Sequence, residues 1–79
     1  MNIKILGTGC SKCSTLENKV REVIKQNSIE AEVEKVTQIN DIMKYGIMMT
    51  PGLVINEKVV SSGRIPQENQ ILEWIKEAM

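Results

Sequence analysis

Histidine is absent from this sequence of 79 residues. Its absence excludes Ser-His-Asp and Cys-His hydrolysis, zinc sites with histidine ligands, and acid–base catalysis by imidazole within the chain. Cysteine occurs twice, as Cys10 and Cys13. Two thiols cannot form the four-ligand cage of a structural zinc site, and one bridge across so short a loop would stabilise little of the fold. We therefore interpret the pair as reactive rather than architectural.

Net charge and long apolar runs are also missing. Ten Lys and Arg balance ten Asp and Glu, so no excess of positive charge attracts nucleic acid phosphates. The apolar runs are a few residues long, whereas a membrane helix needs about 20 residues. The start, Met1 to Leu6, does not resemble a secretory signal because Gly7 and Gly9 interrupt it. We expect a monomeric, cytoplasmic protein that binds neither nucleic acid nor membrane.

The apolar residues of the first half predict two strands and a helix. The chain, 42% hydrophobic, fits a single domain over residues 1–79. Asn2–Leu6 predicts a buried strand, and an amphipathic helix ending near Asn27 is indicated by the helical spacing of Leu16, Val20, Val23 and Ile24. A strand at a sheet edge, with one solvent-exposed face, is predicted next. There, Glu30, Glu32 and Glu34 alternate with Ile29, Ala31 and Val33.

The second half predicts a short helix and a hairpin. The helix contains Ile39, Ile42 and Met43, with Thr37 as its N-cap and Gly46 as its C-terminal stop. The β-branched runs at residues 53–55 and 59–61 predict an antiparallel hairpin, whose polar loop is Asn56, Glu57 and Lys58.

A third helix closes the predicted fold. Pro66 suits its first turn, and its apolar stripe consists of Ile71, Leu72, Ile75 and Met79. The first two strands, joined through a helix, should be parallel, whereas the hairpin is antiparallel. The fold class is therefore α/β, in the order β-α-β-α-β-β-α, with a four-stranded mixed sheet flanked by three helices.

The motif Cys10-Ser11-Lys12-Cys13 lies where the first predicted strand gives way to the first helix. Unpaired N–H groups and the dipole at a helix start stabilise negative charge, which favours a thiolate there. Lys12, a cation between the two sulfurs, favours it further. A separation of three residues on a helical turn brings the second sulfur close enough to form a disulfide. We expect Cys10, nearer the exposed end, to attack and Cys13 to resolve.

These features resemble a known family. The cysteine motif, the Thr50-Pro51 pair immediately before a strand, and the final hairpin and helix together resemble a thioredoxin fold. The short length and the Gly9-Cys10 start are similar to the small glutaredoxin-like thioredoxins, also called small redox-active disulfide proteins. The resemblance covers essentially the whole chain.

The resemblance implies a thiol-disulfide oxidoreductase that acts in electron transport and cell redox homeostasis. Its CxxC pair, Cys10 and Cys13, would exchange disulfides with protein substrates, without a metal or an organic cofactor. A thioredoxin-reductase-like enzyme or a low-molecular-weight thiol would supply the electrons.

The resemblance also implies a substrate-binding surface. The family's matching proline, here Pro51, is cis and packs against the disulfide, and the backbone of the preceding residue, Thr50, binds an extended substrate segment. Ser11 and Lys12, between the cysteines, complete the expected substrate-binding set.

Two departures from related patterns concern the same site. Glutaredoxins have a glycine pair near glutathione, whereas Ser62 replaces the first glycine before Gly63. Larger thioredoxins carry a buried acidic residue behind the second cysteine. The first predicted strand offers none, so we expect water to help deprotonate Cys13.

Two other interpretations of the cysteines remain. The first is that the two thiols are incidental. The second is that they form a soft-metal site, since small heavy-metal-associated domains place CxxC after their first strand and thiolates suit Cu(I). Such domains end in a strand and usually carry a Met in that loop, whereas this sequence predicts a final helix and has Gly7-Thr8-Gly9. For the methionines, we predict Met43 in the core, with Met48 and Met49 on the substrate surface.

Overall fold

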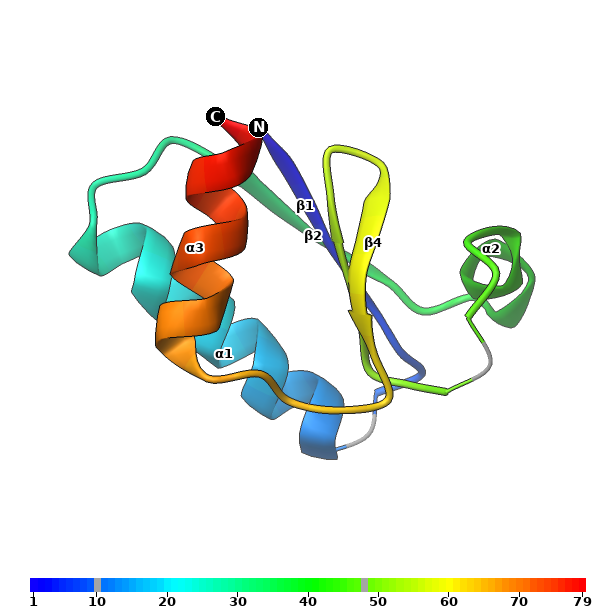
Figure 1. Cartoon of the computed structure of the whole chain (residues 1–79). Helices are drawn as coiled ribbons and strands as arrows, with labels where there is room; N and C mark the ends of the chain where they lie inside the picture. The colour runs from blue at the N-terminus through cyan, green and yellow to red at the C-terminus, as the bar shows by residue number, and fades with distance from the viewer. Residues whose placement is uncertain (10, 48) are drawn as a thin grey trace.

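The computed structural model describes residues 1–9, 11–47 and 49–79. Its elements are β1 (Asn2–Leu6), α1 (Ser11–Gln26), β2 (Glu32–Val36), α2 (Ile39–Lys44), β3 (Gly52–Ile55), β4 (Lys58–Ser62) and α3 (Glu68–Ala78). The described residues thus follow the predicted order β-α-β-α-β-β-α (Figure 1). The predicted thioredoxin-like α/β fold, with a four-stranded mixed sheet and three helices, is confirmed.

The strands form one sheet in the order β2-β1-β3-β4. β1 pairs in parallel with β2 and antiparallel with β3, and β3 pairs antiparallel with β4. The turn of the hairpin consists of Asn56 and Glu57, whose φ angles are 51° and 68°. Two successive residues with positive φ are typical of a type I′ turn. Lys58 therefore belongs to β4 rather than to the loop, which is one residue shorter than predicted.

Side chains of the two central strands alternate between the faces of the sheet, and each face carries its own core. The larger cluster joins Ile3, Ile5, Leu53 and Ile55 to α1 and α3. The smaller cluster joins Leu6 and Val54 to Ile42 of α2 and to Ile47. Figure 1 accordingly shows α1 and α3 side by side on one side of the sheet and α2 on the other.

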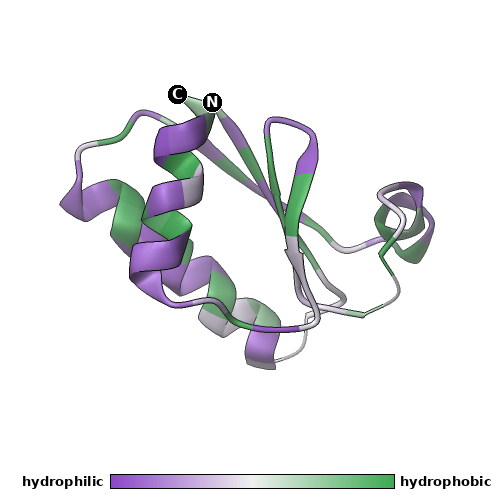
Figure 2. Ribbon diagram, in the orientation of Figure 1, coloured by the Kyte–Doolittle hydropathy of each residue, from purple (hydrophilic) through white to green (hydrophobic). Residues whose placement is uncertain are grey.

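The two longer helices are attached to the sheet by apolar stripes. Leu16 and Val20 of α1 and Ile71 and Ile75 of α3 are completely buried. Burying one such side chain contributes about 1.5–3 kcal/mol. Figure 2 shows hydrophobic and hydrophilic residues alternating along both helices, as amphipathic helices require. No helix among the described residues is long and apolar enough to cross a membrane.

The second strand lies further along the chain than the alternation predicted. β2 begins at Glu32, so Ile29 and Ala31 precede it. Both still pack against the larger core cluster, which explains why they are apolar although they do not pair with a strand. The parallel ladder instead starts where Glu32 lies opposite Asn2. The predicted edge position is confirmed, because β2 is the outermost strand on its side of the sheet.

The predicted starts of the second and third helices are wrong. The N-cap of α2 is Gln38 rather than Thr37, and it makes no side-chain capping hydrogen bond. α3 begins at Glu68 after the N-cap Gln67, so Pro66 precedes the helix instead of occupying its first turn. In both places an extended glutamine serves as the cap without a side-chain hydrogen bond, so the usual preference for Thr or a first-turn Pro does not decide the boundary.

The helix ends follow the sequence more closely. Gly46 has a φ of 76°, and its N–H donates to the carbonyl of Met43 at 2.9 Å. The prediction that Gly46 stops the second helix is therefore confirmed. Met79, by contrast, lies beyond the end of α3 and is 76% exposed, so it does not extend the buried stripe.

Candidate functional site

Cys13 lies in the first turn of α1, which begins at Ser11. Its side chain is buried, at 6% exposure, and it is disulfide-bonded. Cys10, the other cysteine of the sequence, lies outside the described residues. Ser11 and Lys12 are exposed. The predicted position of the motif at a strand-to-helix junction is therefore seen for its last three residues.

Gly7 brings the end of β1 against Cys13. The Gly7 N–H donates to the carbonyl of Val36 at 2.9 Å, which continues the pairing of β1 with β2 by one residue. A methyl group placed on Gly7 would collide with Cys13 Sγ, and it would lie 3.1 Å from Cys13 Cβ and 4.0 Å from Thr50 Cβ. Cys13 and Thr50, which are far apart in the sequence, therefore approach the same glycine.

The peptide bond between Thr50 and Pro51 is cis, the isomer that the family resemblance implies. Pro51 is buried and Thr50 is exposed. The carbonyl of Pro51 accepts a hydrogen bond of 2.8 Å from the N–H of Gly63, which ties the proline to the segment after β4. Thr50 and Pro51 directly precede β3, whose first residue, Gly52, pairs with Leu6 at the end of β1.

Gly63 also packs against a predicted surface residue. It has a φ of 74°, and a methyl group placed on it would lie 3.0 Å from Cβ of Met49. Met49 is 66% exposed, so the side chain lies over the glycine and still faces solvent. A bulkier residue than glycine at position 63 would be strained by its φ and crowded by Met49.

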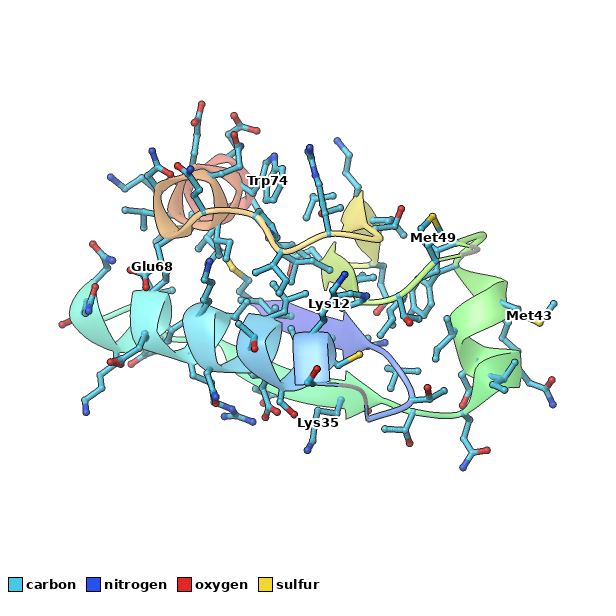
Figure 3. All side chains as sticks on the ribbon, turned by 90° about the horizontal axis from the view of Figure 1, so that it is seen from below. Lys12, Lys35, Met43, Met49, Glu68 and Trp74 are labelled. Atoms are coloured by element: carbon cyan, nitrogen blue, oxygen red, sulfur yellow. The ribbon has the colours of Figure 1, made fainter. Side chains whose placement is uncertain are left out.

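The prediction that Met43 lies in the core is wrong, because Met43 is 65% exposed. α2 is only six residues long, and it turns Ile42 towards the smaller cluster. The next residue along a helix points about 100° away, which places Met43 outside. Figure 3 shows Met43 and Met49 at the end of the molecule that carries α2. Met48 lies outside the described residues, and the substrate role predicted for Met49 remains a prediction.

A small cavity of about 50 Å³ lies beside Cys13. It is lined by Ile5, Gly7, Gly9, Cys13, Ser14, Glu17, Lys35 and Thr37. Glu17 Oε2 accepts a hydrogen bond of 3.0 Å from Arg21 Nε, and Glu17 Oε1 lies 3.6 Å from Lys35 Nζ. The cavity is thus lined by one acidic residue and one basic residue as well as by the buried Cys13.

Sequence reasoning did not single out Glu17 or Lys35. The acidic residue that the family resemblance implies would lie on the first strand, and β1 has none. The signal for Glu17 was its spacing of four residues from Cys13 on one helix. Lys35 had no such signal, because the strand was expected to end before it.

A second polar cluster lies on the α2 side of the sheet. Lys4 Nζ donates to Glu57 Oε1 at 2.7 Å and to the hydroxyl of Tyr45 at 2.9 Å, and that hydroxyl donates to Glu57 Oε2 at 3.1 Å. The hydrogen bond to Glu57 is the largest reason that the pKa of Lys4 is raised, and the same bond holds the pKa of Glu57 below its ordinary value. The cluster ties the hairpin turn to β1 and to the end of α2.

Comparisons with known proteins give a consistent result. A family model described as a thioredoxin domain matches residues 1–76. A thioredoxin of Methanocaldococcus jannaschii is 36% identical over 74 residues, which cover 94% of this chain and 85% of that protein. A thioredoxin of Methanothermobacter thermautotrophicus is 37% identical over 71 residues, which cover 90% of this chain and 92% of that protein.

Proposed function

Because the chain belongs to the thioredoxin domain family, we propose that it is a thiol-disulfide oxidoreductase that cycles between a Cys10–Cys13 disulfide and a dithiol. The observation that carries the proposal is the position of Cys13. It is disulfide-bonded, it lies in the first turn of α1, and it contacts the glycine that also faces Thr50. A disulfide that closes so short a loop adds little stability, so its value is chemical.

The reaction has two steps in which sulfur atoms exchange partners. The Cys10 thiolate attacks one sulfur of a substrate disulfide, so a Cys10–substrate bond forms and the other substrate sulfur leaves as a thiolate. Cys13 then loses its proton and attacks Cys10. The Cys10–Cys13 disulfide forms, the mixed disulfide breaks, and the second substrate sulfur leaves as a thiolate that takes up a proton. Two electrons pass from the protein to the substrate.

The fold supports the first step through the start of α1. Backbone N–H groups in the first turn of a helix have no intrahelical acceptor, and the helix dipole adds positive potential there. The first turn of α1 contains no acidic side chain that would oppose this effect, and Lys12 adds a cation. The role of Ser11 is to keep this turn exposed, since a small polar side chain does not cover it.

The position of Thr50 supports substrate binding. Thr50 is exposed at the start of β3, and it faces the same glycine as Cys13. An extended peptide that binds there through its backbone would present its disulfide to the exposed end of the cysteine motif. Thr50 and Pro51 therefore form one wall of the substrate groove, and Met49 adds adaptable apolar surface beside it.

The partners and the compartment follow from the chemistry. The substrates are proteins with disulfides, and a thioredoxin-reductase-like enzyme or a low-molecular-weight thiol restores the dithiol. A reducing compartment supplies such donors, and catalytic disulfides are the usual kind of disulfide there. We therefore place the protein in the cytoplasm.

The test is the reduction of insulin disulfides in the presence of dithiothreitol. We expect the wild-type protein to accelerate precipitation of the insulin chains and the Cys10→Ser variant to leave the rate at that of dithiothreitol alone. The Cys13→Ser variant is the matched control, since it lacks the same disulfide. Similar urea midpoints for reduced Cys10→Ser and reduced wild type would show that the loss at Cys10 does not come from unfolding.

Equal rates for wild type and Cys10→Ser would overturn the proposal. In that case, tight binding of Cu(I) against a competing chelator would favour the soft-metal interpretation of the two thiols. The helix α2 lies between β2 and β3, whereas heavy-metal-associated domains usually have no helix between their second and third strands, which favours the redox interpretation.

A further inference from the structure

Glu17 is a carboxylate held mostly out of solvent next to Cys13. It lies one helical turn after Cys13 on α1, and its side chain is 15% exposed. Side chains four residues apart lie on the same face of a helix, and both residues line the same cavity. Glu17 and Cys13 therefore border a common space.

Two cations fix the position of this carboxylate. Arg21 Nε donates to Oε2 at 3.0 Å, one turn further along α1. Lys35 Nζ, on the neighbouring edge strand, lies 3.6 Å from Oε1. Lys35 is also in the lining of the cavity, and Figure 3 shows it beside the N-terminal half of α1. The ion pair between Glu17 and Lys35 connects α1 to β2 one helical turn after Cys13.

The cavity is large enough to hold a water between Glu17 and Cys13. A buried water needs roughly 10–15 Å³ of accessible space and two to four polar partners. The cavity offers about 50 Å³ and is lined by Glu17, Lys35, Ser14 and Thr37. It therefore has room and hydrogen-bonding groups for at least one water between the carboxylate and Cys13.

We propose that Glu17 accepts, through a water in this cavity, the proton that Cys13 loses before it attacks the mixed disulfide, and that Lys35 is a positioning residue for Glu17. The inference rests on the proposed function, because it concerns the second step of that reaction. It replaces the expectation that water alone takes the proton. The oxygens of a glutamate carboxylate accept protons and hydrogen bonds.

The proton and the electrons balance in this step. The Cys13 S–H bond breaks, its proton passes by way of the water to Glu17, and the sulfur keeps the electron pair. That pair forms the Cys13–Cys10 bond, while the electrons of the mixed disulfide leave with the substrate sulfur. Glu17 then returns the proton to solvent or to the departing thiolate.

Few of the described residues that line the cavity around Cys13 are charged. α1 contributes Glu17, β2 contributes Lys35, and the loop from Gly7 to Gly9 contributes no charge. Arg21 acts on the cavity through its hydrogen bond to Glu17, and the exposed Lys12 adjoins Cys13 in the chain. Glu17 is thus the acidic side chain of this lining, and its removal tests the inference directly.

The two steps can be separated with dithiobis(nitrobenzoic acid), mixed with an excess of the reduced protein. The first coloured thiolate is released when Cys10 attacks the reagent, and the second is released when Cys13 resolves the mixed disulfide. We expect Glu17→Gln to leave the first release unchanged and to slow the second at neutral pH by about a hundredfold or more, the range of general base catalysis. The exposed Glu22→Gln, on the same helix, is the matched control and should match wild type.

The pH profile separates proton transfer from a structural effect. With Glu17 as the acceptor, the wild-type second release should be nearly independent of pH around neutrality, whereas that of Glu17→Gln should rise in proportion to hydroxide. Glu17→Asp should recover part of the rate. A second release in Glu17→Gln with the wild-type rate and pH profile would overturn the inference alone. Absence of the second release in wild type would overturn the proposed function instead.

Discussion

Cys13 contacts parts of the chain that lie far apart in sequence. Gly7 at the end of β1 touches its sulfur and its Cβ, and Thr50 approaches that same glycine from the start of β3. Glu17 and Lys35 share the cavity beside it. The surroundings of this sulfur are therefore set by three strands and one helix, whereas its immediate sequence neighbours determine only its place at the helix start.

At the residue scale, the ion pair between Glu57 and Lys4 predicts a dependence of stability on pH. The pKa of Glu57 is below its ordinary value of 4.5 because Lys4 and Tyr45 donate to its carboxylate. The unfolded chain therefore binds the proton more tightly than the folded one. The stability that Glu57 contributes is complete above about pH 4.5 and is lost as the pH falls through the lower folded value.

We therefore expect Glu57→Gln to lower the urea midpoint at neutral pH and to lose this difference from wild type in acid. Gln accepts the same positive φ at position 57 about as well as Glu, so the comparison isolates the charge. The exposed Glu73→Gln on α3 should change the midpoint little at either pH. A constant difference between Glu57→Gln and wild type at all pH values would contradict the role given to the ion pair.

Residues of the site differ in how far the sequence predicts them. Cys10 and Cys13 are visible as a motif, and Pro51 is visible once the motif is placed on a fold. From the sequence, Glu17 is one of several charged residues on the predicted solvent-exposed face of a helix. The structure shows that this edge of α1 lies against β2. No local pattern reports a contact between a helix and a neighbouring strand, so the cavity could not be predicted.

At the element scale, the junction between β1 and α1 depends on the absence of a side chain at Gly7. Gly7→Ala would place a methyl group against the sulfur and Cβ of Cys13. Overpacking of this kind costs about 1–3 kcal/mol. We expect the variant to have a lower urea midpoint and a slower second release of thiolate from dithiobis(nitrobenzoic acid), because Cys13 is displaced.

Gly9→Ala separates these two effects. Gly9 has a φ of 93° and nothing lies within 4 Å of the added methyl group, so alanine there is strained but does not touch Cys13. It should lower the urea midpoint and leave the second release closer to wild type than Gly7→Ala does. Equal rates of second release in Gly7→Ala and wild type would contradict the close contact between Gly7 and Cys13.

The elements themselves are predicted better than their boundaries. Periodic apolar residues identify α1 and α3 because the same residues form the core, as Leu16 and Ile71 do. The β2 boundary fails because Ile29 and Ala31 meet the core from a connecting segment. The start of α3 fails because Pro66 is compatible with an extended segment as well as with a first helical turn. Tertiary packing decides each case.

At the scale of the whole molecule, the sheet separates the candidate site from the chain ends. Figure 1 shows both termini at one end of the sheet and the start of α1 at the other. The larger core lies beneath α1 and α3, and the smaller one lies beneath α2. Cys13 and Thr50, which both approach Gly7, lie at the end with the start of α1, so the substrate proposed above would approach away from the termini.

The most direct test of the account is to trap the intermediate between its two steps. Reduced Cys13→Ser and Cys10→Ser proteins, both without the internal disulfide, are mixed with insulin, quenched by alkylation and analysed by mass spectrometry. We predict that Cys13→Ser accumulates a mixed disulfide with an insulin chain through Cys10, that dithiothreitol releases it, and that Cys10→Ser accumulates far less. An equal or larger adduct on Cys10→Ser would contradict the assignment of Cys10 as the attacking sulfur and Cys13 as the resolving one.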